Sequence, residues 1–126
     1  MEFVLYCLDR PEHAALRTQL RPAHLAYAAA RPQAFRFGGP LLDDAGQPRG
    51  SLMILELPNR AALHEHMTGD PFFASALFAS VDIWVTRQVM PEREVGALSR
   101  ETAAAQRLNQ PGFAAGSALP GAPRPS

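Results

Sequence analysis

Two side chains in this sequence have the chemistry of an acid–base pair. His24 lies on a predicted helix, and Asp70 lies between Gly69 and Pro71, at a predicted helix boundary. Imidazole can take up and return a proton near neutral pH, and a carboxylate beside it can orient the ring and stabilise its charged form. Arg21 adds a guanidinium that can bind a substrate carboxylate through two hydrogen bonds. Together these residues suggest proton transfer on a small organic substrate.

Both members of this pair also have a purely structural interpretation. Asp followed by Pro is typical of an N-cap and a first helical position, so Asp70 can be a plain helix cap. His24 lies at the edge of an apolar helical stripe and can be a satisfied histidine at the border of core and solvent. The two residues are far apart in the sequence. Only the fold can bring them together.

The other potentially reactive residues carry weaker signals. His64 and His66 are two positions apart on a predicted helix, about 200° round its axis, and cannot share a metal ligand site. His13 is expected in solvent, and Cys7 lies in an apolar strand that favours a core role. The sequence has no Gly-rich phosphate loop, Gly-x-Ser-x-Gly or Cys-x-x-Cys motif, and nothing beyond His24 suggests haem. We therefore expect no metal and no cofactor.

Composition narrows the class of protein. The chain has 126 residues, 47% of them hydrophobic, which suits one domain with a sizeable core. Twelve basic residues balance twelve acidic ones, and all the basic residues are arginine. Without a basic surface stripe, nucleic acid is not the expected partner. The absence of lysine excludes Schiff-base chemistry from a lysine side chain.

The sequence favours a cytoplasmic protein that does not enter a membrane. The apolar run near the N-terminus carries an acid at Glu2 and stops at Asp9, unlike a secretion signal. No run approaches the roughly 18 apolar residues that a spanning helix needs. The single cysteine, Cys7, cannot form an internal disulfide, which fits a reducing compartment.

The elements that must position the candidate pair follow from hydrophobic periodicity and turn residues. Pro22 either kinks the first helix or starts a second one. Phe35 and Phe37 are expected on one face of the second strand, and Glu56 at the end of the third. The order predicts strands over 3–8, 33–42, 50–57 and 78–89 and helices over 12–30 and 60–68.

This order predicts an α+β fold, a ferredoxin-like βαββαβ antiparallel sheet with both helices on one face. The other face carries apolar residues, so we expect a homodimer that packs sheet on sheet. The predicted domain covers residues 1–91. Residues 92–126 form an extension, with an Ala-rich helix to about residue 108 and then a flexible tail rich in Pro, Gly, Ala and Ser.

Four short motifs resemble a known family. They are Arg21-Pro22-Ala23-His24-Leu25, Gly39-Pro40-Leu41 followed by Asp43 and Gly46, Gly50-Ser51-Leu52, and Asp70-Pro71-Phe72. Over residues 1–91 their order resembles the YciI-like (YCII-related) proteins. The resemblance implies a dimeric α/β barrel with one pocket in each subunit and a His–Asp pair, here His24 and Asp70, as its active site. It also implies that Gly39, Pro40 and Ser51 lie near the pair.

The resemblance suggests a class of reaction and not a substrate. Most members of the family have no established reaction, one relative dehydrochlorinates chlorinated hydroxyquinones, and the fold is similar to that of muconolactone isomerase. We therefore expect a small lyase or isomerase with His24 and Asp70 as catalytic residues. The residues expected to bind the small-molecule substrate are Arg21, Gly39, Pro40, Ser51 and Phe72.

Two further interpretations stay open from the sequence. The protein can be a binding module without chemistry, whose pocket Phe35, Phe37, Phe72 and Trp84 would line. It can also be a structural dimer domain whose C-terminal tail contacts a partner.

Overall fold

The computed structural model describes residues 1–109, and this part of the chain divides into two compact units, at Thr86 and Arg87. The first unit contains every residue of the predicted site. Its elements are β1 (Glu2–Asp9), α1 (Ala14–Ala29), β2 (Phe35–Leu42), β3 (Pro48–Glu56), α2 (Arg60–Gly69), α3 (Pro71–Ala74) and β4 (Phe78–Thr86). The second unit contains α4 (Ala97–Leu108).

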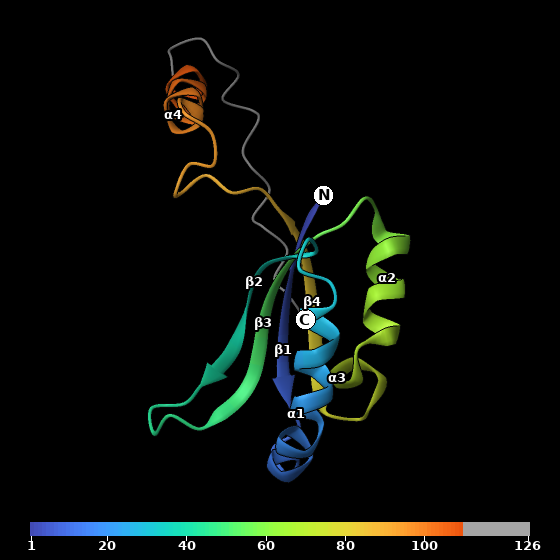
Figure 1. The fold of residues 1–126 in the computed structure, drawn as a ribbon. Helices are drawn as coiled ribbons and strands as arrows, with labels where there is room; N and C mark the ends of the chain where they lie inside the picture. The colour runs from blue at the N-terminus through green and yellow to red at the C-terminus, as the bar shows by residue number, and fades with distance from the viewer. Residues whose placement is uncertain (110–126) are drawn as a thin grey trace. The chain divides into compact units, whose positions relative to one another are not determined.

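A four-stranded sheet is the framework of the first unit. Its strand order is β2-β3-β1-β4, and every neighbouring pair is antiparallel. Figure 1 shows α1, α2 and α3 on one face of this sheet. The predicted α+β fold with a four-stranded antiparallel sheet is therefore confirmed.

The core lies between the two central strands and the helices. Phe3, Leu5 and Cys7 of β1 are fully buried, and Met53 and Leu55 of β3 are buried beside them. Burying one such side chain contributes about 1.5–3 kcal/mol. The alternate residues of β1 face away from the helices, and this second face is also apolar, as the sequence predicts.

Pro22 does not interrupt the first helix, because α1 runs through it as one element. A proline inside a helix removes the hydrogen bond to the carbonyl four residues earlier, here that of Thr18. Pro22 and Thr18 both lie on the exposed side of α1. Water can therefore satisfy the freed carbonyl, and the helix continues to the turn that carries His24.

The expectation that Phe35 and Phe37 share a face was wrong. A β-bulge separates them, so Phe35 pairs with Leu55 while Phe37 pairs with Ile54. Because successive residues of β3 point to opposite faces, the two phenylalanines do so as well. Phe35 packs against the core, and Phe37 is 50% exposed on the far side of the sheet.

Several predicted elements were too long, and two of them deserve an explanation. β4 ends at Thr86, not at residue 89, because Thr86 pairs with Glu2 at the start of β1 and no strand residue lies beyond it. In the second unit, α4 begins at Ala97 and not at residue 92, following Gly96 with its φ of 89°. The predicted tail over residues 110–126 lies outside the described residues.

Within residues 1–109, no helix combines the length and the apolar character that crossing a membrane requires.

Candidate functional site

His24 and Asp70 are in direct contact. His24 lies on α1, and Asp70 lies at the junction where α2 ends and α3 begins. The Nδ1 atom of His24 is 2.8 Å from one carboxylate oxygen of Asp70 and 3.0 Å from the other. Asp70 is fully buried, and 12% of the His24 side chain is exposed. The pair therefore lies at the edge of the core, with the imidazole on the outer side.

The chain around Asp70 holds its carboxylate in place. Its Oδ1 accepts a hydrogen bond from the backbone N–H of Phe72 at 3.0 Å, as expected of an N-cap. Its own backbone N–H donates to Met67, and its carbonyl accepts from Phe73 and Ala74. Asp70 therefore caps α3 and contacts His24 at the same time, and the two interpretations of this residue do not compete.

The hydrogen bonds assign the tautomer of His24. An ionised carboxylate only accepts hydrogen bonds, so an imidazole that bonds to it donates from Nδ1, and in its neutral form the lone pair is then on Nε2. The ring of Phe72 stacks on the imidazole, with centroids 3.9 Å apart and planes 10° apart. The orientation of the imidazole is thus set at one edge by Asp70 and on one face by Phe72.

Gly69 ends α2 for a reason that the sequence did not reveal. Gly69 does not adopt the left-handed conformation that often follows a helix, because in residues 1–109 only Gly46 and Gly96 have positive φ. The side chain of Tyr27 packs against Gly69 instead. A Cβ atom at this position would lie 2.6 Å from the Tyr27 hydroxyl oxygen. Glycine allows α1 to approach the end of α2, and this approach brings His24 to Asp70.

Arg17 is a buried residue of the site that sequence reasoning did not select. Its guanidinium forms two hydrogen bonds with Asp9, at 2.5 and 3.0 Å, and donates to the Ser51 hydroxyl at 2.7 Å. It also lies over the Phe72 ring, 4.8 Å from the centroid. Arg17, Arg21 and His24 follow the i, i+4, i+7 spacing of one helix face, and this spacing was the available signal.

A cavity of about 320 Å³ opens beside this face of α1. Arg17, Arg21 and Arg49 line it, together with Pro40, whose strand neighbour is Ser51. Arg17 is paired with Asp9 and Arg49 with Asp43. Within residues 1–109, Arg21 has no hydrogen bond or ion pair, so its guanidinium is available to a ligand. His24 lies one helical turn further along α1.

The predicted substrate-binding residues separate into two groups. Arg21 and Pro40 line this cavity, and Ser51 lies behind it through its bond to Arg17. Gly39 is opposite Leu52, on the far face of the sheet, so the structure does not bring it to the others. Phe72 is 1% exposed and packs against the His24 ring, which suits a positioning residue better than a substrate contact.

The structure also bears on the other reactive residues. Burial, assisted by the negative charge of Asp70, raises the pKa of the Cys7 thiol to about 12, so this thiol is protonated and unreactive at neutral pH. His13, expected in solvent, contacts the Ala76 carbonyl oxygen at 2.9 Å through Nδ1. Residues 1–109 contain no group of three or more His, Cys, Asp or Glu side chains placed to hold a metal ion.

Comparison with known proteins gives three matches of interest. Residues 1–87 match the model of the YCII-related domain. The chain is 30% identical to 5-chloro-2-hydroxyhydroquinone dehydrochlorinase (TftG) from Burkholderia phenoliruptrix AC1100, solved with 2,5-dihydroxybenzoquinone, with a TM-score of 0.65 over 70% of this chain and 95% of that one. It is 23% identical to PA3566 from Pseudomonas aeruginosa, with a TM-score of 0.45 over 69% and 92% of the two chains. No curated protein matches the chain.

The matched region contains the whole sheet, α1 to α3 and both members of the His–Asp contact. The family model thus covers the part of the chain in which the sequence motifs, the fold and the site geometry coincide. The chain belongs to the YCII-related domain family.

Proposed function

We propose that the protein is a lyase or isomerase for a small organic substrate, with His24 as the general base and Asp70 as its acidic partner. One observation carries this proposal. The Nδ1 edge of His24 is held by a fully buried carboxylate, while Nε2 has no hydrogen bond within residues 1–109. An imidazole fixed at one nitrogen and free at the other is suited to proton transfer.

The chemistry follows from the tautomer. The lone pair on Nε2 takes a proton from a substrate O–H or C–H group, and the Asp70 carboxylate stabilises the imidazolium that forms. In an elimination, the electron pair left on the substrate moves through it and expels a leaving group as an anion. In an isomerisation, the imidazolium returns the proton to another substrate atom. Such general acid–base catalysis contributes about 10²–10⁴-fold to a rate.

The arginine-lined cavity supports an anionic or hydroxylated substrate. Arg21 has an available guanidinium one turn from His24, whereas Arg17 and Arg49, which line the same cavity, are paired with Asp9 and Asp43. A guanidinium binds a carboxylate or a phenolate oxygen well. The named activity of the 30% identical TftG, dehydrochlorination of a chlorinated hydroxyhydroquinone, is an elimination of this kind. We therefore propose a hydroxylated ring compound as the substrate class.

Chloride release from 5-chloro-2-hydroxyhydroquinone, measured without oxygen, tests the proposal. We expect His24→Gln to lower kcat/KM by at least about 10²-fold and Asp70→Asn by about 10–10²-fold, because both weaken proton transfer. Asn also caps helices, so Asp70→Asn preserves the cap of α3. Arg21→Gln should raise KM more than it lowers kcat. His64→Gln, on the exposed side of α2, is the matched control and should keep full activity.

Unchanged turnover in both His24→Gln and Asp70→Asn would refute the acid–base role. The main alternative is a binding module without chemistry. Binding of the ring compound without chloride release, surviving His24→Gln, would favour that alternative, because the arginine-lined cavity would then act without the imidazole.

The functional unit that we propose is a homodimer. The sheet face opposite the helices carries exposed apolar side chains, among them Tyr6 at 41% and Phe37 at 50%. Exposed apolar surface of this kind on a sheet is typical of a protein interface. A second copy of the chain, packing its sheet on this one, would cover the face and form a dimeric α/β barrel.

A further inference from the structure

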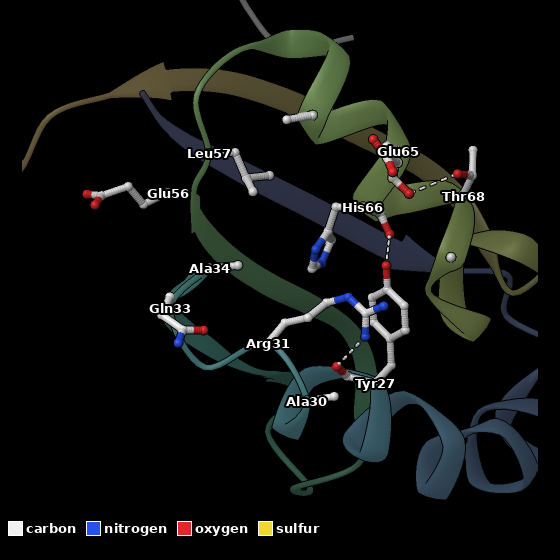
Figure 2. A pocket seen from close by; sticks show the side chains of 12 residues that line it. Tyr27, Ala30, Arg31, Gln33, Ala34, Glu56, Leu57, Glu65, His66 and Thr68 are labelled. Atoms are coloured by element: carbon white, nitrogen blue, oxygen red, sulfur yellow. Dashed lines mark hydrogen bonds between the residues drawn. The ribbon is translucent and has the colours of Figure 1, made fainter.

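A second and larger cavity, of about 670 Å³, lies between the end of α1 and α2 (Figure 2). It shares no lining residue with the arginine-lined cavity, and neither His24 nor Asp70 lines it. The residues around it come from the end of α1, the segment before β2, the end of β3 and α2. They include Tyr27, Arg31, Leu57, Glu65, His66 and Gly69.

The two helical walls of this cavity carry opposite charges. On the α1 side, the Arg31 guanidinium lies over the Tyr27 ring, 3.6 Å from the centroid, and one nitrogen donates to the Tyr27 carbonyl. On the α2 side, Glu65 also lines the cavity. In the described part of the chain, no hydrogen bond or ion pair involves the Glu65 carboxylate, and the other Arg31 donors have no partner. One cation and one anion are therefore available to a ligand.

His66 lies between these walls and carries an unsatisfied polar atom. It is 6% exposed, the rings of Tyr27 and Phe35 contact it edge to face, and its Nε2 is buried without a hydrogen-bond partner in residues 1–109. An unsatisfied buried nitrogen costs about 1–3 kcal/mol. Figure 2 shows the imidazole extending from α2 toward Arg31, on the cavity side of the helix.

The neutral imidazole of His66 can hydrogen-bond to either an anionic or a cationic group of a ligand. Burial lowers the pKa of His66, and the positive charge of Arg31 lowers it further, so the ring is neutral at neutral pH. A neutral imidazole can donate to a carboxylate or accept from an ammonium, depending on the tautomer. The rest of the lining is mixed. Its apolar part accommodates a hydrocarbon group and consists of Ala30, Ala34, Leu57, Ala62 and Gly69. Its polar part consists of Gln33, Thr68 and Glu56, and Glu56 is paired with Arg36.

We propose that this cavity binds a zwitterion with an apolar body, namely an α-amino acid with an aromatic or aliphatic side chain. Its carboxylate pairs with Arg31, its ammonium pairs with Glu65, and its polar end satisfies Nε2 of His66. Because Nε2 is closed to water in the unliganded protein, the ligand reaches it when a neighbouring side chain moves. Arg31 is exposed, and exposed side chains change rotamer within nanoseconds.

Three probes that share a phenyl group and differ in charge test the proposal by calorimetry on the full chain at pH 7.5. They are phenylalanine, 3-phenylpropanoate, which lacks the ammonium, and 2-phenylethylamine, which lacks the carboxylate. We expect phenylalanine to bind at least about tenfold more tightly than either analogue, because each analogue loses one charge-assisted pair. Leucine, with an aliphatic body, should bind as well.

Single substitutions test whether Arg31 binds the ligand carboxylate and Glu65 binds the ligand ammonium. Arg31→Gln should weaken phenylalanine binding about tenfold and leave 2-phenylethylamine binding unchanged, whereas Glu65→Gln should weaken phenylalanine and spare 3-phenylpropanoate. Arg107→Gln and Glu12→Gln, two exposed residues that are not in the lining of this cavity, are the matched controls and should bind phenylalanine like the wild type. The ¹⁵N signals of the His66 imidazole should shift on binding, and those of His13 should not.

Three results would overturn the inference. The first is the absence of binding by both phenylalanine and leucine. The second is equal affinity for the three phenyl probes, and the third is phenylalanine binding that neither Arg31→Gln nor Glu65→Gln changes. The amino-acid site and the acid–base site are independent proposals. Failure of phenylalanine binding would leave the chloride-release test of His24 unaffected, and failure of chloride release would leave the binding test unaffected.

Discussion

At the scale of single residues, Asp70 caps α3 and contacts His24 with one carboxylate, and in the proposed function this carboxylate also supports the general base. Its negative charge has no water around it and depends on the N–H groups of His24 and Phe72. Replacing an N-cap aspartate by alanine typically costs about 0.5–2 kcal/mol, and the Nδ1–H of His24 would also lose its acceptor. Asp70→Ala would therefore mix unfolding with lost catalysis, which is why Asn is the informative replacement at this position.

His66 should make the protein less stable on the acid side. Burial lowers its folded-state pKa below the ordinary value of 6.5, with Arg31 and His24 acting in the same direction and Asp70 against it. Below pH 6.5 the unfolded chain gains a proton that the folded chain does not, so the free energy of unfolding falls with pH until the folded pKa is passed. We expect His66→Leu to make this decrease shallower between pH 7.5 and 5.5.

Urea denaturation of wild type and His66→Leu at both pH values measures this difference. His64→Gln, on the exposed side of the same helix, is the control and should keep the wild-type pH dependence. If the free energy of unfolding fell by the same amount from pH 7.5 to pH 5.5 in wild type and in His66→Leu, His66 would not contribute to the acid sensitivity.

At the scale of elements, Gly50 allows β3 to approach β1 closely. A Cβ atom there would lie 2.1 Å from the Cys7 carbonyl oxygen, a distance that only backbone movement can relieve. We expect Gly50→Ala to lower the free energy of unfolding by more than about 2 kcal/mol, and to disturb the neighbouring Ser51–Arg17 contact. Urea denaturation with a far-ultraviolet circular dichroism readout measures this change.

Gly38→Ala is the matched substitution in the next strand. A Cβ atom at Gly38 would meet only the Phe35 side chain, at an ordinary 3.4 Å, so the expected loss is below about 1 kcal/mol. If Gly50→Ala were no more destabilising than Gly38→Ala, close strand packing would not be the reason for glycine at position 50.

Sequence patterns predicted most elements because their signals are local. Asn59 caps α2 and Asp70 caps α3, as their neighbours indicate. The bulge between Phe35 and Phe37 and the end of β4 depend on partner strands, which no local pattern contains. The His24–Asp70 contact and the Arg17 network depend on how α1 docks, so residue types suggested the pair and only the fold could join it.

At the scale of the molecule, the apolar sheet face decides the expected assembly. We expect wild type to elute as a dimer in size-exclusion chromatography with light scattering. Tyr6→Lys should produce a monomer, because it places a charge at the centre of the proposed interface while Asp82, directly opposite on β4, balances that charge in the free chain. Leu25→Glu, an exposed apolar residue on α1, is the control and should stay dimeric. A monomeric wild type would refute the homodimer.

The location of Asp70 has a consequence for how this family can diverge. The atoms that hold the imidazole also join α1 to the α2–α3 junction, so under the proposed function selection for turnover and selection for a folded chain would act on the same contact. A lineage that lost the reaction would still need a partner for the buried carboxylate. Retention of both residues in a relative is therefore weak evidence of enzyme activity, whereas an available Nε2 beside an open cavity is more informative.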